Sequence, residues 1–334
     1  MTSTLAAQLI EAGHIEPVRF DIDEPGDGEV VVRVSAVGLC GSDAHWYEHA
    51  GIGDATLSRP LVLGHEFCGV IESGERAGQR VAVDPSIPCL TCVQCETGRH
   101  NLCSRLVFAG HGHTHGALRE RLTWPERCLV PIPDDMPDEV AAMLEPLGVA
   151  LHAIDLAALR DREYIGVVGC GPIGVLLAIA AQARGRTHIA ASEPLPHRAE
   201  AAANLGLDVG AHPSASLDVV FETSGTDAGL ATAMEWVRPA GRVVVVGIPD
   251  RDVTSLPASV GRRKELELRW CRRMRLGDLS RAAEVAARDP GSIGGLVSHR
   301  FSLSEAVEAF ETLVRRQGMK VIVFPNPDPG TRDG

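Results

Sequence analysis

The chain has 334 residues, more than a single hydrophobic core usually holds, so we expect two domains. A composition with 45% hydrophobic and 23% charged residues is that of a folded globular protein and argues against a disordered chain. A formal net charge of −12 at pH 7 disfavours nucleic acid and anionic membranes as partners, which leaves a small molecule as the expected ligand.

The beginning of the chain has no basic segment followed by an apolar one, so we expect no secretory signal and a cytoplasmic protein. The apolar stretch 165–181 contains four glycines and a proline, and it is too short to span a membrane. Because the cytoplasm keeps thiols reduced, the nine cysteines indicate bound metal rather than a disulfide framework.

The two halves of the chain differ in the pattern of their apolar segments. Residues 28–37, 60–72, 79–83 and 128–132 are short apolar runs separated by Gly, Pro and Asp, which predicts a mainly β, barrel-like first half. From residue 165 onward, apolar runs alternate with helical segments, which is typical of a doubly wound parallel sheet. We therefore predict an α/β protein, with a last helix at 304–316 before the strand KVIVF.

Three potential metal ligands occur early in the chain, in separate segments. Cys40 begins the run CGSDAHW, and His65 and Glu66 lie in LVLGHEFCG. Zinc accepts sulfur, nitrogen and oxygen donors, and a catalytic zinc site needs three protein ligands and one open position. Glu145, in LEPLGVALHA, is a fourth candidate. Each residue alone also has an ordinary explanation: a buried thiol, a hydrogen-bonded histidine or a solvated acid.

A compact cysteine cluster follows, with the spacing C-x2-C-x2-C-x7-C. Tetrahedral zinc with no open position is the natural occupant of four thiolates, so this site would hold a loop and perform no chemistry. An iron–sulfur cluster is the alternative, but the proline that usually follows the last cysteine of such motifs is absent. The four predicted ligands are Cys89, Cys92, Cys95 and Cys103.

The run GHGHTHG places His111, His113 and His115 at alternating positions. Three closely spaced histidines suggest a metal site. However, no second segment supplies further ligands, and a single histidine is more often solvated or hydrogen-bonded than metal-bound. We interpret this run as a loop on the substrate side or in solvent.

A nucleotide-binding turn opens the second half of the chain. The sequence VVGCGPIG carries G-x-G-x-x-G between an apolar strand and an Ala- and Leu-rich helix, where the backbone can approach a pyrophosphate. Glu193 lies 19 residues beyond the last of these glycines, where an acid binds ribose hydroxyls and repels a 2′-phosphate. NAD is therefore favoured over NADP, although Arg198 could bind such a phosphate. The predicted cofactor contacts are Gly169, Gly171, Pro172, Ile173, Gly174, Glu193, Arg198, Val246, Gly247 and Ile248.

Four segments together resemble the zinc-containing medium-chain dehydrogenases, nearest to the sorbitol or polyol dehydrogenase branch. These segments are GLCGSDAHW, LVLGHEFCGVI, the four-cysteine run and LEPLGVALHA. The resemblance implies a GroES-like β-rich catalytic domain at 1–146, with the zinc lobe at about 85–105. It also implies a Rossmann NAD-binding domain at 147–269, a return to the catalytic domain at 270–334, and a homodimer or homotetramer.

The resemblance also implies roles for individual residues. A catalytic zinc would be held by Cys40, His65 and Glu66, with Glu145 either a fourth ligand or the residue that holds the zinc-bound water. Glu145 marks the polyol branch, because simple alcohol dehydrogenases have cysteine there. Ser42 and His45 would pass the proton of the alcohol to solvent, which suits a histidine because its pKa lies near neutral pH.

The substrate side departs from the polyol pattern. Arg269 matches an arginine that contacts cofactor and substrate, but Trp46 and Trp270 stand where that branch has tyrosine. An indole donates one hydrogen bond and accepts none, which favours a less hydroxylated or a cyclic alcohol. Two alternatives to a polyol dehydrogenase remain open: an L-threonine 3-dehydrogenase, and a zinc- and nucleotide-binding subunit without turnover.

Overall fold

The computed structural model describes residues 3–210, 213–249 and 251–326. The chain divides into two compact units. Unit 1 comprises Met1–Glu145 and Leu279–Gly334, and unit 2 comprises Pro146–Asp278. The boundary that returns the chain to unit 1 therefore lies after residue 278, later than the predicted end of the cofactor domain at residue 269.

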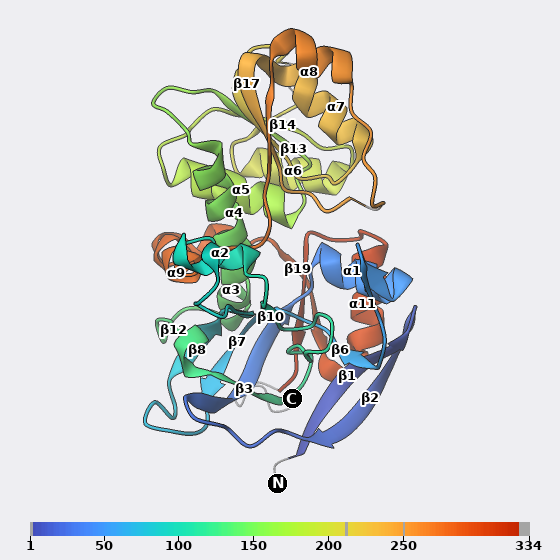
Figure 1. Cartoon of the computed structure of the whole chain (residues 1–334), viewed down its shortest axis with the longest axis vertical. Helices are drawn as coiled ribbons and strands as arrows, with labels where there is room; N and C mark the ends of the chain where they lie inside the picture. Colours follow the sequence, from blue (N-terminus) through green and yellow to red (C-terminus); the bar gives the residue numbers. More distant parts are fainter. Residues whose placement is uncertain (1–2, 211–212, 250, 327–334) are drawn as a thin grey trace. The chain divides into compact units, whose positions relative to one another are not determined.

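Unit 1 is built around a seven-stranded sheet with the order β12-β8-β7-β3-β20-β19, in which β11 also pairs with β3 (Figure 1). Neighbouring strands are antiparallel except β19 and β20, which run parallel. The strands of this sheet are β3 (Glu29–Gly38), β7 (Glu66–Ile71), β8 (Arg80–Val83), β11 (Arg121–Pro125), β12 (Leu129–Pro131), β19 (Val297–Ser302) and β20 (Lys320–Phe324).

Smaller sheets and short helices complete unit 1. A three-stranded sheet has the order β2-β1-β6, and two further strand pairs are β4 with β5 and β9 with β10. These strands are β1 (Ser3–Glu11), β2 (His14–Asp21), β4 (Gly51–Ile52), β5 (Ala55–Thr56), β6 (Leu61–Val62), β9 (Ser86–Ile87) and β10 (Val107–Phe108). The helices are α1 (Gly41–His49), α2 (Val93–Glu96), α3 (Asp138–Ala142), α9 (Asp278–Arg288), α10 (Pro290–Gly294) and α11 (Ala306–Val314), with single 3-10 turns at His100–Leu102, Glu126–Cys128 and Leu303–Glu305.

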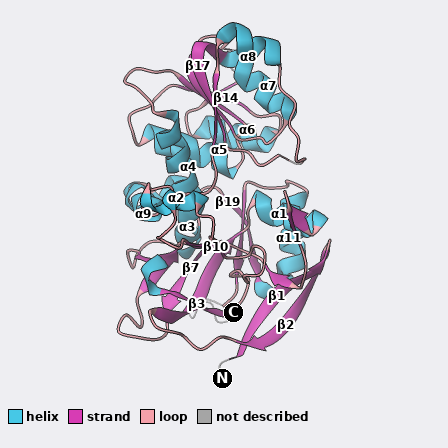
Figure 2. Ribbon diagram, viewed as in Figure 1, coloured by secondary structure: helices cyan, strands magenta, loops and turns pink. Residues whose placement is uncertain are grey.

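Unit 2 is a six-stranded parallel sheet with helices between its strands (Figure 2). The strand order β15-β14-β13-β16-β17-β18 places the first strand in the middle, so the order reverses between β13 and β16. In open parallel sheets, ligands bind at the carboxyl ends of the strands at such a reversal. The strands are β13 (Ile165–Val168), β14 (Ile189–Ser192), β15 (Asp208–Val209), β16 (Leu217–Glu222), β17 (Val237–Val245) and β18 (Glu267–Trp270). The helices are α4 (Leu144–Ala157), which begins in unit 1, α5 (Pro172–Gln182), α6 (Pro196–Asn204), α7 (Asp227–Trp236) and α8 (Ala258–Lys264).

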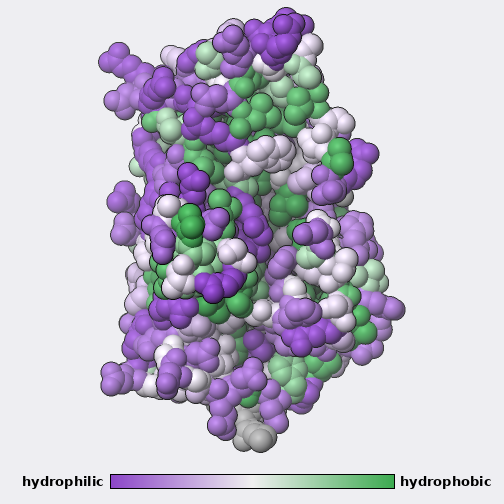
Figure 3. Space-filling view, viewed as in Figure 1, coloured by the Kyte–Doolittle hydropathy of each residue, from purple (hydrophilic) through white to green (hydrophobic). Residues whose placement is uncertain are grey.

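The burial of the strands explains why the two halves of the sequence look different. All four residues of β13 are buried, as are the last five of β17, because helices cover both faces of a parallel sheet. On the face shown in Figure 3, hydrophilic residues cover most of the surface, and small hydrophobic patches lie between them. No helix among the described residues is long and apolar enough to cross a membrane.

The turn between β13 and α5 depends on glycine at two of its positions. Gly169 has φ 92°, a left-handed conformation that glycine adopts without strain. A Cβ on Gly174 would lie 2.0 Å from the carbonyl oxygen of Gly169, whereas a Cβ on Gly171 would meet only the end of a flexible side chain, Arg198 Nη1, at 3.3 Å. Helix and strand therefore pack more tightly at Gly174 than at Gly171.

We expect Gly174→Ala to lower the free energy of unfolding by about 1–3 kcal/mol, because the added methyl group has to push backbone apart. Gly171→Ala is the matched control in the same turn, and it should have a clearly smaller effect. Urea unfolding of both variants without cofactor measures the difference. Equal losses of stability in the two variants would contradict the packing argument.

Candidate functional site

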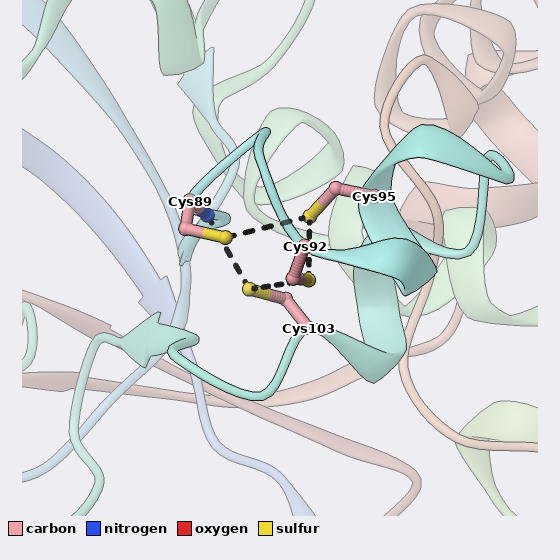
Figure 4. Close-up of side chains that lie close together, drawn as sticks. All are labelled: Cys89, Cys92, Cys95 and Cys103. Atoms are coloured by element: carbon pink, nitrogen blue, oxygen red, sulfur yellow. Dashed lines mark hydrogen bonds between the residues drawn. The ribbon is translucent and has the colours of Figure 1, made fainter.

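The four cysteines of the predicted lobe converge on one point (Figure 4). The sulfur atom of Cys95 lies 4.0 Å from that of Cys89 and 3.5 Å from that of Cys92, and the sulfur of Cys92 lies 3.8 Å from that of Cys103. They come from the turn before α2, from α2 itself and from the segment after His100–Leu102. All four ligand atoms lie within 4.8 Å of one another, which fits a tetrahedral thiolate site.

The surroundings of this cluster favour a thiolate at Cys89, whereas burial raises the pKa of Cys95 to about 12. Backbone N–H groups of Cys89 and Arg105 point to the sulfur of Cys103, at 3.3 and 3.4 Å. Hydrogen bonds, first from the backbone of Thr91 and then from Arg105, lower the pKa of Cys89 to about 5. Since metal binding requires deprotonated cysteines, these donors prepare the lobe for a cation.

Cys40, His65 and Glu66 form the second candidate metal cluster, in unit 1. Cys40 is the N-cap residue of α1, His65 immediately precedes β7, and Glu66 is the first residue of that strand. One ligand atom from each lies within 4.8 Å of the others, so the structure brings together a sulfur, a nitrogen and an oxygen donor. His65 and Glu66 are only 6% and 1% exposed, so a cation held here would be largely shielded from water.

Asp43, which the sequence analysis did not select, connects two of these segments. Its carboxylate accepts the N–H of Cys40 at 3.0 Å and that of Gly64 at 3.2 Å, and it lies 3.5 Å from Nδ1 of His65. Burial alone would lower the pKa of His65, but the charge and hydrogen bond of Asp43 raise it well above its usual value. Asp43 therefore fixes the ring of His65 and leaves Nε2 as the atom available to a metal, which would displace a proton on binding.

Lys320 is the second residue that the sequence analysis missed. It is 1% exposed, begins β20, and donates to the carbonyl oxygen of Leu39 at 2.9 Å and to the carboxylate of Glu66. Burial opposes its charge, but Glu66 and then Cys40 outweigh burial and raise the pKa of Lys320. The ammonium group of Lys320, at the start of β20, thus balances the negative charge of the candidate ligands.

Glu145 lies near this cluster but not in it. Among the residues that the structure describes, the metal-like group contains Cys40, His65 and Glu66 without Glu145. Glu145 is 5% exposed, and burial raises its pKa to about 8, an effect that His65 opposes and Glu66 strengthens. The raised pKa lets its carboxyl group hold a proton near neutral pH.

The predicted relay residues and one predicted substrate contact, Trp46, lie on α1. The hydroxyl oxygen of Ser42 is 3.5 Å from Nε2 of His65, so Ser42 borders the candidate metal site. His45 is half-buried, and its ring centre lies 6.1 Å from that of His49. Trp46, a predicted substrate contact, is 2% exposed and packs in the hydrophobic core of unit 1. Its indole therefore supports the wall of the site more than it presents a surface to a ligand.

The histidine run of 111–115 forms a turn that packs against other parts of unit 1. The ring of His111 meets that of Trp46 edge-on at 5.6 Å, and Nδ1 of His115 accepts the N–H of Val62 at 3.1 Å. His113 lies between them in the turn, near the backbone pairing of residues 111 and 114. The run is thus attached to the segment that leads into His65 and to the helix that carries Ser42.

In unit 2, the predicted phosphate-binding turn lies at the carboxyl end of β13, beside the reversal of strand order. Gly171 caps α5 in an extended conformation, and Pro172 and Ile173 begin the helix. Free N–H groups at a helix start, together with the glycines 169, 171 and 174, offer a pyrophosphate close access to backbone donors.

Glu193 follows β14, one strand away from that turn. Its carboxylate accepts the N–H of Cys170 at 2.7 Å and that of Leu195 at 2.9 Å, which holds it at the carboxyl edge of the sheet. The guanidinium of Arg198 lies close to Gly171, since a Cβ there would be 3.3 Å from its Nη1. An acid and a base thus flank the turn, and their predicted roles toward a ribose and a phosphate stay predictions.

The segment after β17 packs closely against the segment after β16. The N–H groups of Val246 and Gly247 donate to the carbonyl oxygen of Glu222 at 2.7 and 3.0 Å. A Cβ on Gly247 would lie 2.2 Å from the backbone nitrogen of Gly225, and a Cβ on Gly225 would lie 2.2 Å from the carbonyl oxygen of Ile248. Glycine is required at both positions for these two backbone segments to approach.

Arg269 and Trp270 end the edge strand β18 of unit 2. Arg269 donates to the carbonyl oxygen of Leu156 and to the carboxylate of Glu267, both at 2.6 Å. Trp270 is 57% exposed, so its indole is available to a ligand or another surface. The described contacts of Arg269 are structural, and its predicted role toward cofactor and substrate stays a prediction.

Comparisons with known proteins agree with this geometry. Residues 26–134 match the alcohol dehydrogenase GroES-like domain, and residues 172–288 match the zinc-binding dehydrogenase domain. The D-xylulose reductase of Saccharomyces cerevisiae is 32% identical over 339 residues, which cover 93% of this chain and 94% of that protein. The chain belongs to the zinc-dependent medium-chain dehydrogenases.

Within this dehydrogenase family, the relatives are of the polyol branch. Sorbitol dehydrogenase 1 of Saccharomyces cerevisiae is 31% identical, covering 88% of this chain and 90% of that protein. The crystal structure of L-idonate 5-dehydrogenase from Escherichia coli has a TM-score of 0.90 and 26% identity, covering 97% of this chain and 98% of its own. The predicted family and the predicted combination of a GroES-like and a Rossmann domain are therefore confirmed. The chain is a zinc- and nicotinamide-dependent alcohol dehydrogenase.

We expect Asp43→Asn to weaken zinc binding by Cys40, His65 and Glu66 about 10- to 100-fold, the usual effect of losing a carboxylate that orients a histidine ligand. Zinc retained per chain against increasing chelator measures the loss. Glu48→Gln, on the exposed side of the same helix, is the matched control. The cysteine lobe should keep its ion in both variants, and wild-type retention at the second site in Asp43→Asn would refute the role of Asp43.

Proposed function

We propose that the protein oxidises a secondary alcohol of the polyol, cyclitol or sugar-alcohol type to a ketone and transfers the hydride to NAD. The observation that carries this proposal is the buried Cys40, His65 and Glu66 cluster, with its sulfur, nitrogen and oxygen donors. Names of relatives support the substrate class, since a xylulose reductase and a sorbitol dehydrogenase act on such compounds.

Two zinc sites fit the donor sets of this chain. Cys89, Cys92, Cys95 and Cys103 would hold a structural ion, and Cys40, His65 and Glu66 would hold a catalytic one. Bound there, zinc supplies a Lewis acid for the alcohol oxygen, and the nicotinamide accepts the hydride. Glu145, which stands beside this cluster, would hold water or the substrate hydroxyl by a hydrogen bond rather than ligate the ion.

The proton of the alcohol has to leave a buried site. Ser42 is suited to accept it first, because its hydroxyl lies beside Nε2 of His65, and His45 lies one helical turn further along α1. Histidine is the side chain that most readily exchanges protons with water at neutral pH. We therefore assign Ser42 Oγ and the ring of His45 as successive proton carriers.

The choice of cofactor rests on Glu193. Its carboxylate is held at the edge of the sheet by two backbone N–H groups, in the position where an acid accepts ribose hydroxyls. Its negative charge would repel the 2′-phosphate of NADP. Arg198 near the turn would contribute to binding the pyrophosphate, along with the backbone of residues 169–174 and 246–248.

Trp270 and Arg269 are the proposed substrate-side residues, whereas Trp46 is buried in the core of unit 1. Since an indole only donates a hydrogen bond, Trp270 favours a substrate with fewer hydroxyls or with a ring. The thiol-rich sequence suits a reducing compartment, so we place the enzyme in the cytoplasm, as a homodimer or homotetramer like the family it belongs to.

The reaction is tested by mixing the purified protein with NAD or NADP and a panel of sorbitol, xylitol, ribitol, inositols, amino polyols and L-threonine. We expect NAD to be reduced with at least one polyol or cyclitol and NADP to be reduced more slowly. Reduction with L-threonine alone would instead favour a threonine 3-dehydrogenase. No turnover with any alcohol in zinc-loaded protein would favour a zinc- and nucleotide-binding subunit.

Cys40→Ser should abolish most of this activity while leaving the lobe zinc in place, because it removes one ligand of the catalytic ion only. Cys271→Ser is the matched control, since Cys271 lies outside both clusters. Rates and zinc content are measured on the same preparations. Full activity in Cys40→Ser would remove this cluster from the mechanism.

His45→Gln should slow turnover mainly at neutral pH, by about 10- to 100-fold, with recovery at high pH where hydroxide accepts the proton. The readout is the dependence of kcat on pH for wild type and variant. His49→Gln, four residues further on the same helix, is the control. A pH profile in His45→Gln that matches wild type would exclude His45 from the proton relay.

A further inference from the structure

A cavity of about 390 Å³ lies in unit 2, and the proposed reaction does not use it. It is formed where α4 and α5 end and where the chain continues after β18. Its lining combines charged and apolar side chains, among them Asp155, Arg184, Arg186, Arg275, Ile154 and Leu159. Three arginines therefore face one cavity in a chain whose net charge is −12.

A single acid among the lining residues opposes these arginines. Asp155 accepts Nη2 of Arg184 at 2.9 Å and Nη2 of Arg275 at 2.5 Å, so its one negative charge is shared by two guanidinium groups. The carboxyl ends of α4 and α5 each add about half a negative charge. Asp278 also lies 3.7 Å from Nε of Arg275, so Arg275 is balanced by two acids, and the positive charge with no acid beside it among these contacts is that of Arg186.

Arg186 is the least satisfied of the three. Its Nη2 donates to the carbonyl oxygen of Arg160 at 2.7 Å, but its Nε is buried and has no hydrogen-bond partner among the described residues. A carbonyl oxygen does not neutralise a guanidinium, and a buried N–H without a hydrogen-bond partner is costly even in a half-buried side chain. An anion in the cavity would offset this cost.

We propose that this cavity binds a small organic phosphate. Guanidinium groups match the paired oxygens of a phosphate, and several arginines converging on one cavity give a phosphate more than one charged hydrogen bond. The apolar side chains of Ile154 and Leu159 line the same cavity, so a phosphate ester with a short carbon skeleton fits it better than inorganic phosphate does.

This site is separate from the predicted pyrophosphate turn. Gly171 caps the start of α5, whereas Arg184 follows the end of the same helix. A helix of 11 residues is about 16 Å long, so the two anion sites stand at opposite ends of α5. A phosphate ester would thus bind here without competing with the cofactor.

Calorimetric titration of the full-length protein with glycerol 3-phosphate, in the presence of saturating NADH, tests the proposal. We expect one site on wild type, and we expect inorganic phosphate to bind the same site more weakly. Arg184→Gln and Arg186→Gln should each reduce the affinity about tenfold, the loss of one charged hydrogen bond. Arg315→Gln, an exposed arginine paired with Glu311 in unit 1, is the matched control and should bind as wild type.

Hydrogen exchange locates the bound ester without relying on variants. Glycerol 3-phosphate should slow exchange in peptides that cover residues 154–160 and 183–187 of wild type, while potassium chloride at equal ionic strength should not. Absence of binding to wild type, equal affinity in all three variants, or protection confined to other peptides would each overturn the proposal. Because NADH is present throughout, a failure here would leave the assignment of the dehydrogenase reaction untouched.

Discussion

Two carboxylates and two cationic groups are buried side by side in unit 1, and the candidate site depends on their pairing. Asp43 holds His65, and Lys320 holds Glu66, with each of the four residues at most 6% exposed. Removing one member of such a buried pair typically costs about 3–5 kcal/mol, because its partner keeps an uncompensated charge. The sheet must therefore bring these residues together in a fixed register, or the core would not tolerate them.

Gly38 shows how closely the backbone is fitted to these charges. In the sheet, Gly38 pairs with Glu66 on one side and with Ile322 on the other. A Cβ at this position would lie 2.4 Å from the carboxylate of Glu66 and 2.9 Å from Cε of Lys320. The strand β3 thus leaves open the space in which the ion pair lies, and it does so two residues before the candidate ligand Cys40. Ligands, counter-charge and backbone form a single packed arrangement.

The sequence alone could predict those parts of the molecule whose residues lie close together along the chain. The strand, glycine turn and helix at 165–182 are contiguous, and the four cysteines lie within a run of fifteen residues. Their spacing in the sequence is therefore enough to predict a nucleotide-binding turn and a metal site. Lys320 could not be found in this way, since it lies 254 residues from Glu66 and begins an ordinary apolar strand. Asp43 offered a weak signal, a residue three positions after Cys40 in a capping box, which identifies a helix start but not a partner for His65. The burial of Trp46 was equally invisible, because an indole on a short helix can face either way.

The candidate binding surfaces of the two units are formed by different groups: side chains in unit 1 and backbone in unit 2. In unit 1, side chains with opposite charges hold the donor atoms, so the site depends on residue identity at each position and on long-range pairing. In unit 2, backbone groups at the carboxyl ends of β13, β16 and β17 form the surface, and glycines at 174, 225 and 247 let these segments approach. Backbone donors are present in any sequence that adopts the turn, so what must be specified there is mainly the absence of side chains. This difference explains why Asp43 and Lys320, which hold the predicted metal ligands, required the structure to be found, whereas the predicted nucleotide turn could be recognised from three glycines placed between a strand and a helix.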